Sequence, residues 1–437
     1  MDKPLPLRGR GSHGMYYQFH ELSRALFSPV TYLAHAGARM FSAPGSWLAR
    51  LPASAPIAAG YELIYRLGKD YPKPEWGIHE ANVRGAKVAV AEQIVQSKPF
   101  CRLVRFKRYS DDAALVGVLK QSPVVLVVPA LSGHQPTLVR DTVRTLLSDH
   151  KVYVMDWVDA RMVPTDQGSF TLEDYVGYVR DFMRHIGAEG LHVISVCQPC
   201  VPVLAAVALM AAAGEPVPSS LTMMGGPIDA RRSPTRVNDL ATTNSLAWFE
   251  SQLVQEVPAR YPGAGRQVYP GFLQHAGFVA MNPLRHMSSH WNFFRHLVEG
   301  DLEDAEAHRR FYDEYNAVLD MPAEYYLDSI RIVFQEHLLP RGLWHVGGER
   351  VAPELLTTTG LFTIEGELDD ISGPGQTQAA HDLCTGIPAE RKQHMTVAGA
   401  GHYGIFSGRR WREVVYPRVR DFIASTDTVP RRNPVVA

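Results

Sequence analysis

Apolar and polar positions along most of the chain predict short buried strands separated by amphipathic helices. Six runs rich in β-branched or other apolar residues have the length of strands. They are residues 124–128 (VVLVV), 152–155 (VYVM), 192–196 (HVISV), 221–224 (LTMM), 361–364 (LFTI) and 395–397 (MTV). Residues 171–186 and 200–213 form the clearest helical stretches between them. This alternation predicts an α/β fold with a mostly parallel sheet flanked by helices.

A different pattern precedes these strands, in residues 15–85, which we expect to be an N-terminal helical segment. From Met15, apolar residues recur at spacings of three and four, the period of an amphipathic helix. They are Phe19, Leu22, Leu26, Val30 and Leu33. Pro29 is expected to bend or divide the helix. Because such a stripe needs only a core to face, we expect the helix to pack on the main domain, while a surface-binding helix or a transit sequence stays open.

The alternation stops between residues 231 and 341, where aromatic, proline and histidine residues crowd together. An insertion between two strands of such a sheet is a natural cap, or lid, over the carboxyl ends of the strands. The predicted organisation divides the chain into five parts. These are a disordered extension (1–14), the helical segment (15–85), an α/β core (86–230 and 342–425), the cap (231–341) and a flexible tail (426–437).

Composition narrows the classes of function. The 437 residues are 46% hydrophobic and 20% charged with a net charge of −1, which indicates a globular protein and argues against a nucleic-acid partner. The four cysteines are too few for a disulfide framework and suit a reducing compartment. No run of residues predicts a secretion signal or a membrane span.

Candidate chemistry begins where the strand at 192–196 meets the following helix. Cys197 lies in the sharp turn between them, the position of the nucleophile in a nucleophile elbow, although Ser195 and Pro199 replace the usual flanking glycines. A helix N-terminus favours the thiolate form of a cysteine, and an adjacent imidazole favours it further. Taken alone, Cys197 fits equally well as a small buried residue.

Two later segments favour catalysis. LFTIEGELDDISG ends a strand in acids, and GAGHYGIFSG places a histidine among glycines after another strand. The order of nucleophile, acid and histidine is that of α/β-hydrolase triads, so we expect Asp369 to orient His402 and His402 to deprotonate Cys197. Three neighbouring carboxylates remain alternatives, namely Glu365, Glu367 and Asp370. His192 and His381 are expected to be structural.

Backbone amides are the expected oxyanion donors. One is the amide of Gln198, after the nucleophile, and the other lies at Ala130 or Leu131, after the strand at 124–128. His134 in the same loop is a candidate substrate contact, although a loop histidine without a role is as good an interpretation.

Cys197 and Cys200 also form a CxxC pair between a strand and a helix, the arrangement of thioredoxin-like redox sites. That alternative leaves the late Asp and His segments and the large cap unexplained. A zinc site is weaker still, because a second ligand pair is missing. We therefore expect no metal and no organic cofactor.

Long strings across the chain resemble the intracellular poly(3-hydroxybutyrate) depolymerases, which belong to the polyhydroxyalkanoate depolymerases, and more distantly the polyhydroxyalkanoate synthases. The strings include GYELIYRLGK, HVISVCQPC, MMGGPIDARRSPT, GFLQHAGFVAMNP, GELDDISG and GHYGIFSGRRWR. The resemblance implies an α/β-hydrolase fold, a cysteine nucleophile at Cys197, an acid at Asp369, a base at His402, and action on amorphous polymer in cytoplasmic granules.

Hydrolysis of polyester through a cysteine thioester, releasing 3-hydroxybutyrate monomers or oligomers, is thus the expected function, with the granule surface as partner. Two alternatives stay open. One is a synthase-like acyltransferase that uses the same thioester, and the other is a non-catalytic granule-binding protein. The oligomeric state has no basis in the sequence.

Overall fold

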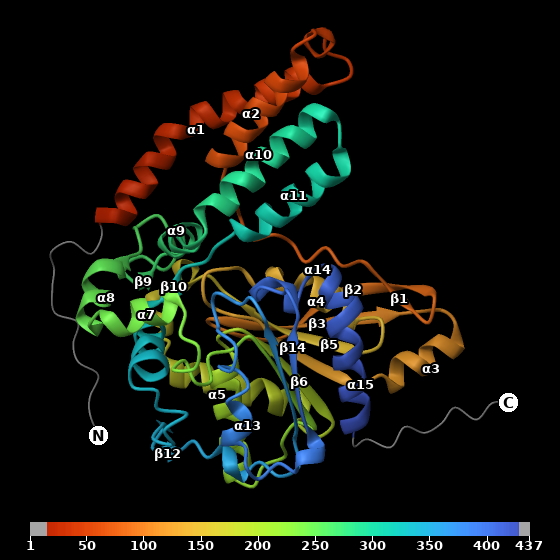
Figure 1. Cartoon of the computed structure of the whole chain (residues 1–437), viewed down its shortest axis with the longest axis vertical. Helices are drawn as coiled ribbons and strands as arrows, with labels where there is room; N and C mark the ends of the chain where they lie inside the picture. The colour runs from red at the N-terminus through yellow and green to blue at the C-terminus, as the bar shows by residue number, and fades with distance from the viewer. Residues whose placement is uncertain (1–14, 428–437) are drawn as a thin grey trace.

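The computed structural model describes residues 15–427, and one large sheet forms its centre (Figure 1). Among these residues the sheet has nine strands in the order β1-β2-β3-β5-β4-β6-β7-β13-β14. Their bounds are Glu80–Val83 (β1), Ala86–Lys98 (β2), Cys101–Tyr109 (β3), Val124–Val128 (β4), Lys151–Trp157 (β5), Leu191–Val196 (β6), Ser220–Met224 (β7), Gly360–Gly366 (β13) and Lys392–Val397 (β14). Pairing is antiparallel from β1 to β5 and parallel from β5 to β14.

Helices cover both faces of this sheet. They are α3 (Ala113–Gln121), α4 (Arg140–Leu146), α5 (Leu172–Ile186), α6 (Cys200–Ala212), α13 (Ala380–Leu383), α14 (Gly408–Arg410) and α15 (Tyr416–Thr426). Alternate residues of β4 enter two different cores. Leu126 and Val128 pack with residues of α5 and α6, whereas Val125 and Val127 pack with residues of α4 and α15. The predicted α/β-hydrolase architecture is therefore confirmed.

All six predicted runs lie in strands, and the two clearest predicted helices correspond to α5 and α6. Helix α6 is buried on every side, which suits its Ala- and Val-rich sequence, because small side chains let it approach the sheet closely. Helix α5 begins at a capping box in which Thr171 and Asp174 satisfy each other's backbone amides.

The segment between β7 and β13 contains most of the remaining elements. They are α7 (Arg236–Thr243), α8 (Leu246–Leu253), α9 (Gly271–Met281), α10 (Pro283–Glu299), α11 (Leu302–Tyr315), α12 (Ala323–Asp328), a π-helix (Ser329–Gln335), a small sheet of β8 (Gln255–Glu256), β9 (Gln267–Tyr269) and β10 (Met321–Pro322), and the hairpin of β11 (His345–Val346) and β12 (Glu349–Arg350). The loop after β4 is tied to this segment, since Gln135 N donates to Ala317 O at 3.1 Å.

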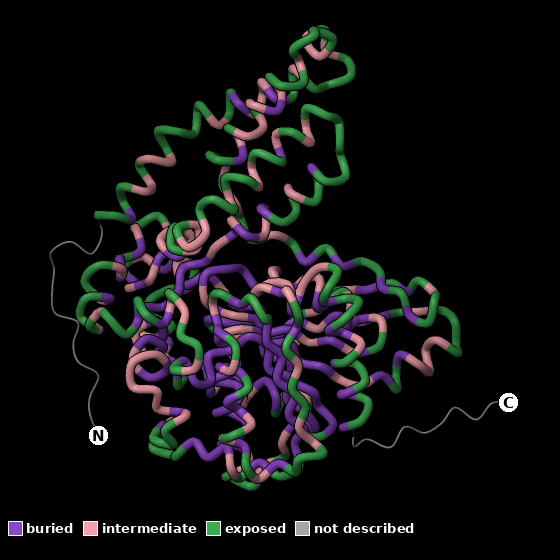
Figure 2. Tube along the Cα trace, in the orientation of Figure 1, coloured by how far each residue is buried: buried purple, intermediate pink, exposed green. Residues whose placement is uncertain are grey.

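Two helical hairpins project from the body and lie against each other (Figure 1). One consists of α1 (Met15–Ser42) and α2 (Ser54–Gly68), and the other of α10 and α11. We call these four helices the helical arm. Buried residues concentrate in the sheet and its covering helices, while the arm is largely exposed or half-buried (Figure 2).

The start of the first helix packs on the rest of the protein as predicted, through Tyr17 and Glu21, but the face that packs is not the predicted one. Its apolar stripe does not face the main domain. The exposed fractions are 69% for Phe19, 59% for Leu22, 68% for Leu26, 51% for Val30 and 65% for Leu33. Further along, the helix contacts α2 through small residues, including the buried Ala34 and Ala38. A periodic pattern identifies the face of a helix but not what covers that face.

Three other findings concern Pro29, the first three strands and the two ends of the described residues. Pro29 lies inside α1 without dividing it. The antiparallel strands β1, β2 and β3 were not predicted, and β1 falls inside the segment expected to be helical. Helix α15 includes Thr426, the first residue of the predicted tail, whereas the predicted extension 1–14 and residues 428–437 lie outside the described residues.

Candidate active site

The turn after β6 holds Cys197 in an unusual backbone conformation. Its φ is +70°, in the left-handed region that non-glycine residues rarely adopt. Two hydrogen bonds hold the turn, from Cys197 N to Met224 O at 2.7 Å and from Cys200 N to Cys197 O at 3.1 Å. Strain of this kind at a strand-to-helix turn is typical of a nucleophile elbow, where it presents the side chain to a cavity.

Two glycines after β7 make room for this turn, and neither was among the predicted site residues. A Cβ on Gly226 would lie 2.3 Å from Cβ of Cys200, and one on Gly225 would lie 3.0 Å from Cε1 of His402. Gly225 also has a φ of +59°. A pair of adjacent glycines directly after a strand was the available signal.

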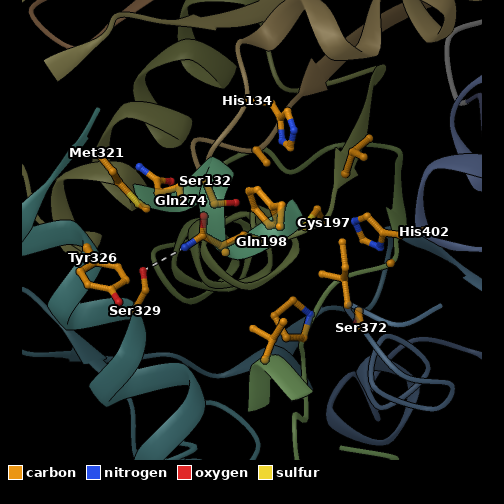
Figure 3. A pocket seen from close by; sticks show the side chains of 18 of the residues that line it. Ser132, His134, Cys197, Gln198, Gln274, Met321, Tyr326, Ser329, Ser372 and His402 are labelled. Atoms are coloured by element: carbon orange, nitrogen blue, oxygen red, sulfur yellow. Dashed lines mark hydrogen bonds between the residues drawn. The ribbon is translucent and has the colours of Figure 1, made fainter. Parts of the chain in front are cut away.

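His402 and Asp369 form a buried pair beside Cys197 (Figure 3 labels Cys197 and His402). His402 Nδ1 lies 2.7 Å from Asp369 Oδ2, and the two side chains are 4% and 0% exposed. The other carboxylate oxygen of Asp369 accepts hydrogen bonds from the amides of Ile371 and Ser372, both at 2.9 Å. The carboxylate is thus fixed in orientation and directed at one nitrogen of the imidazole.

The electrostatics of this pair favour a protonated imidazole. Burial alone lowers the pKa of His402, but the negative charges of Asp369 and Cys197, together with hydrogen bonds to both, raise the pKa well above its usual value. His402 can therefore accept a proton from the thiol and hold it as an imidazolium between Asp369 and Cys197.

The alternative acids lie in other environments. Glu365 accepts hydrogen bonds from three backbone amides, those of Gly375, Thr377 and Gln378, each at 2.8 Å. Glu367 accepts from the amide of Gly399, and Asp370 is exposed and accepts from Asn282. Of the four carboxylates, Asp369 is the one within hydrogen-bond reach of His402.

The two candidate oxyanion donors come from turns at the ends of neighbouring strands, β6 and β4. Within residues 15–427, the backbone amides of Gln198 and Leu131 have no hydrogen-bond acceptor. The side chain of Leu131 lies in the core, whereas Ala130 and Ser132 on either side of it line the cavity. The side chain of Gln198 donates to Ser329 Oγ at 3.1 Å, which joins the turn at Cys197 to the segment between β7 and β13 (Figure 3).

Cys197 and His402 line a cavity of about 290 Å³ whose wall is mostly apolar. Much of its wall comes from the segment between β7 and β13. The apolar contributors there include Leu240, Phe249, Phe278, Met281, Met321, Tyr326, Ile330 and Phe334. Such a cavity suits an apolar or weakly polar substrate.

His134 lines the same cavity and is 5% exposed. Its ring stacks on Phe278 with the centroids 5.1 Å apart and contacts Tyr315 and Tyr403. Burial lowers the pKa of His134 to about 3, so the imidazole is neutral near pH 7. Among the described residues, its Nε2 is a buried polar atom without a hydrogen-bond partner.

The thiol of Cys200 lies behind the turn and not in the cavity. It is 0% exposed and accepts a hydrogen bond from Ser195 Oγ at 3.3 Å. Burial raises the pKa of Cys200 to about 12. This environment opposes the thiolate on which redox exchange depends, and favours a packing role for Cys200. His192 and His381 likewise hydrogen-bond to neighbouring strand hydroxyls, at Ser220 and Thr363.

One group of side chains in residues 15–427 has spacing suited to a metal ion, and it lies in the helical arm. The ligand atoms of His296, Asp301 and Asp304 lie within 4.8 Å of one another. Asp301 is the N-cap of α11 and accepts from the amide of Asp304, which accounts for its position without an ion.

Within residues 15–427, no helix combines the length and apolarity needed to cross a bilayer.

Comparison with known proteins gives one family match. Residues 225–427, just under half of the chain, match the family described as "PHB de-polymerase C-terminus". This segment contains Asp369, His402 and the part of the chain that forms most of the cavity wall. No curated protein matches the chain.

Several solved structures are similar. A monoacylglycerol lipase from Paleococcus ferrophilus is 12% identical, with 70% of this chain and 96% of that chain covered and a TM-score of 0.41. The 2-hydroxy-6-oxo-6-phenylhexa-2,4-dienoate hydrolase of Rhodococcus sp. strain RHA1 is 13% identical, with 77% and 99% covered and a TM-score of 0.43. An esterase from Thermogutta terrifontis is 13% identical, with 80% and 98% covered and a TM-score of 0.41. Because these TM-scores are low, the assignment of the fold rests instead on the order of the strands in the sheet and on the strand-to-helix turn at Cys197.

Proposed function

We propose, from the match of residues 225–427 to the family described as "PHB de-polymerase C-terminus", that the chain hydrolyses the ester bonds of amorphous poly(3-hydroxybutyrate) through a thioester on Cys197. The observation that carries the proposal is the buried Asp369–His402 hydrogen bond beside a cysteine with a φ of +70°. A fixed acid, an oriented imidazole and a strained nucleophile turn together match the requirements of acyl transfer.

The proposed reaction has two steps. In the first, the Cys197 thiolate attacks the ester carbonyl, a C–S bond forms, the ester C–O bond breaks, and imidazolium His402 gives its proton to the departing alkoxide. In the second, neutral His402 takes a proton from water and the hydroxide forms a C–O bond to the thioester carbon. The C–S bond then breaks, the carboxylic acid product leaves, and His402 returns its proton to the sulfur of Cys197. Asp369 holds the imidazole in the tautomer that presents Nε2 to the reaction in both steps.

The remaining site residues have supporting roles in the proposal. The amides of Gln198 and Leu131 bind the oxyanion of each tetrahedral intermediate, and loss of one such donor typically costs about 3 to 4 kcal/mol of transition-state stabilisation. His134 contributes a neutral ring to the mostly apolar wall of the cavity, where it contacts the bound polymer in the proposal. The chemistry requires neither a metal nor an organic cofactor. We place the activity in the cytoplasm, at the surface of polymer granules, since four cysteines suit a reducing compartment.

The test is release of soluble 3-hydroxybutyrate from amorphous polymer particles by the wild type, Cys197→Ala and Cys384→Ala. Cys384 is buried and lies outside the residues that line the cavity, so its variant controls for the loss of a thiol as such. We expect release from the wild type and Cys384→Ala and none from Cys197→Ala. Equal release by all three proteins would contradict the proposal. Incorporation of hydroxybutyryl-coenzyme A into polymer, without release, would instead support the acyltransferase alternative.

A further inference from the structure

We propose that the outward face of α1 is a docking surface for the uncharged surface of the solid polyester. This face consists of Phe19, Leu22, Leu26, Val30 and Leu33, which we call the α1 stripe. Each of these side chains is more than half exposed, at 51% to 69%. The inference rests on the proposed function, because that function makes the substrate a solid, and an enzyme reaches a solid only through a surface of its own.

Helix α1 is held firmly against the rest of the protein, so the exposure of the stripe does not come from a loose helix. The buried Tyr17 donates its hydroxyl hydrogen to Asp320 Oδ2 at 2.6 Å, and Glu21 forms an ion pair with Arg260. Further along, a Cβ on Gly37 would lie 2.9 Å from the ring of Tyr61 in α2. The small residues of α1 thus face the protein while its large apolar residues face outward.

The charges of α1 favour a neutral surface. Three residues of the helix carry a full charge, namely Glu21, Arg24 and Arg39. Glu21 is paired with Arg260 and Arg24 with Asp70, so neither provides a free charge. Helices that lie on anionic membranes carry several lysines or arginines on the polar face. A polyester has no such charge to match, and its methyl and methylene groups suit leucine and phenylalanine side chains.

The stripe is also connected to the catalytic cavity. His20, next to Phe19, stacks on Phe272 of α9 with the ring centroids 4.0 Å apart. The same helix, α9, supplies Phe278 and Met281 to the cavity wall. Exposed apolar side chains continue from α9 along α10, with Leu284 77%, Met287 67% and Trp291 61% exposed. Contact of α1 with the polymer therefore places the apolar wall of the cavity close to the same surface.

The experiment uses the double variant Leu22→Asp/Leu26→Asp and a matched control, Leu343→Asp/Leu355→Asp. The control residues are each 49% exposed and lie outside the arm. All proteins also carry Cys197→Ala in the binding assay, so that hydrolysis cannot change the particles. Binding to amorphous poly(3-hydroxybutyrate) particles is measured by sedimentation, alongside phosphatidylcholine vesicles with and without phosphatidylserine. Ester hydrolysis is measured on p-nitrophenyl butyrate with Cys197 intact.

We expect the α1 variant to bind polymer at least roughly tenfold more weakly, because two leucines no longer bury apolar surface against it. Hydrolysis of the soluble ester should equal that of the wild type. The matched control should keep both properties. Unchanged polymer binding by the α1 variant would overturn the inference, as would stronger wild-type binding to the vesicles than to polymer. Conversion of a wild-type dimer into a monomer by the α1 change, seen by light scattering, would also overturn it, since a second copy would then cover the stripe. Failure of the soluble-ester assay in every protein would instead contradict the proposed function and leave the binding result valid.

Discussion

The most informative single substitution is Asp369→Asn, because the surroundings of this side chain dictate which way an amide must point. Oδ1 of Asp369 accepts two backbone amide hydrogens, at 2.9 Å each, so the asparagine must place its carbonyl oxygen there. Its NH₂ group then faces His402 Nδ1 from the place of Oδ2, which in the wild type lies 2.7 Å from that nitrogen. A nitrogen that receives this hydrogen bond carries no proton, so the proton of the neutral imidazole moves to Nε2.

That tautomer cannot accept a proton from Cys197, and the imidazolium loses its buried counter-charge. The same change in a serine triad lowers kcat about 10⁴-fold, which corresponds to about 5.4 kcal/mol of barrier. We expect a loss of this order in hydrolysis of both p-nitrophenyl butyrate and amorphous polymer. The melting temperature should stay close to that of the wild type, since the variant has the same shape and keeps both backbone hydrogen bonds.

Asp370→Asn is the matched control, because Asp370 is the neighbouring residue, is exposed and bonds to Asn282. Its activity should remain within about twofold of the wild type. A loss of less than tenfold in Asp369→Asn, or an equal loss in both variants, would refute the assignment of the acid.

Three further predictions concern stability and the second thiol. Gly226→Ala should lower the free energy of unfolding by about 1 to 3 kcal/mol in urea titrations, because its Cβ would lie 2.3 Å from Cβ of Cys200. Gly117→Ala is the control and should not lower it, because the space around Gly117 is open. Cys200→Ser should keep ester hydrolysis measurable on p-nitrophenyl butyrate, and complete loss in a folded variant would favour the redox interpretation. Burial and the charge of Asp320 raise the pKa of Asp159 from 3.8 to about 7. The protonated carboxyl therefore stabilises the folded state fully below pH 3.8, and this contribution is lost as pH rises through about 7. In urea titrations from pH 4 to 8, the free energy of unfolding of the wild type should fall as pH rises, and that of Asp159→Asn should fall less.

Much of the α/β core was predictable because its signals are local. The strands that carry the candidate site are short apolar runs, and a residue just past the end of a parallel strand must lie at the edge of the sheet where the other strand ends meet. This is why Cys197, Asp369 and His402 could be proposed together. The order of the segments favoured Asp369 but left Asp370, its neighbour in the same loop, open, since the difference depends on the two backbone amides that turn one carboxylate inward.

The remaining features depend on contacts between distant parts of the chain. The stripe of α1 was visible as a period of three and four, but its exposure follows from the packing of Ala34 and Ala38 against α2. The need for glycine at position 226 follows from its approach to Cys200. Strands β1 to β3 escaped prediction because charged and small residues interrupt their apolar positions, so that no continuous apolar run marks them, although β2 has 13 residues and β3 has 9.

The central claim is that Cys197 carries the acyl group, and trapping that group tests it most directly. Wild type, Cys197→Ser and Cys384→Ala are mixed with p-nitrophenyl butyrate, quenched in acid within milliseconds to seconds, and analysed by intact mass and peptide mapping. We expect a butyryl adduct on the peptide containing Cys197 in the wild type and in Cys384→Ala, removed by neutral hydroxylamine as a thioester is, and no thioester at position 197 in Cys197→Ser. Turnover of the ester by wild type with no adduct at any time point, or an adduct on another residue, would contradict it.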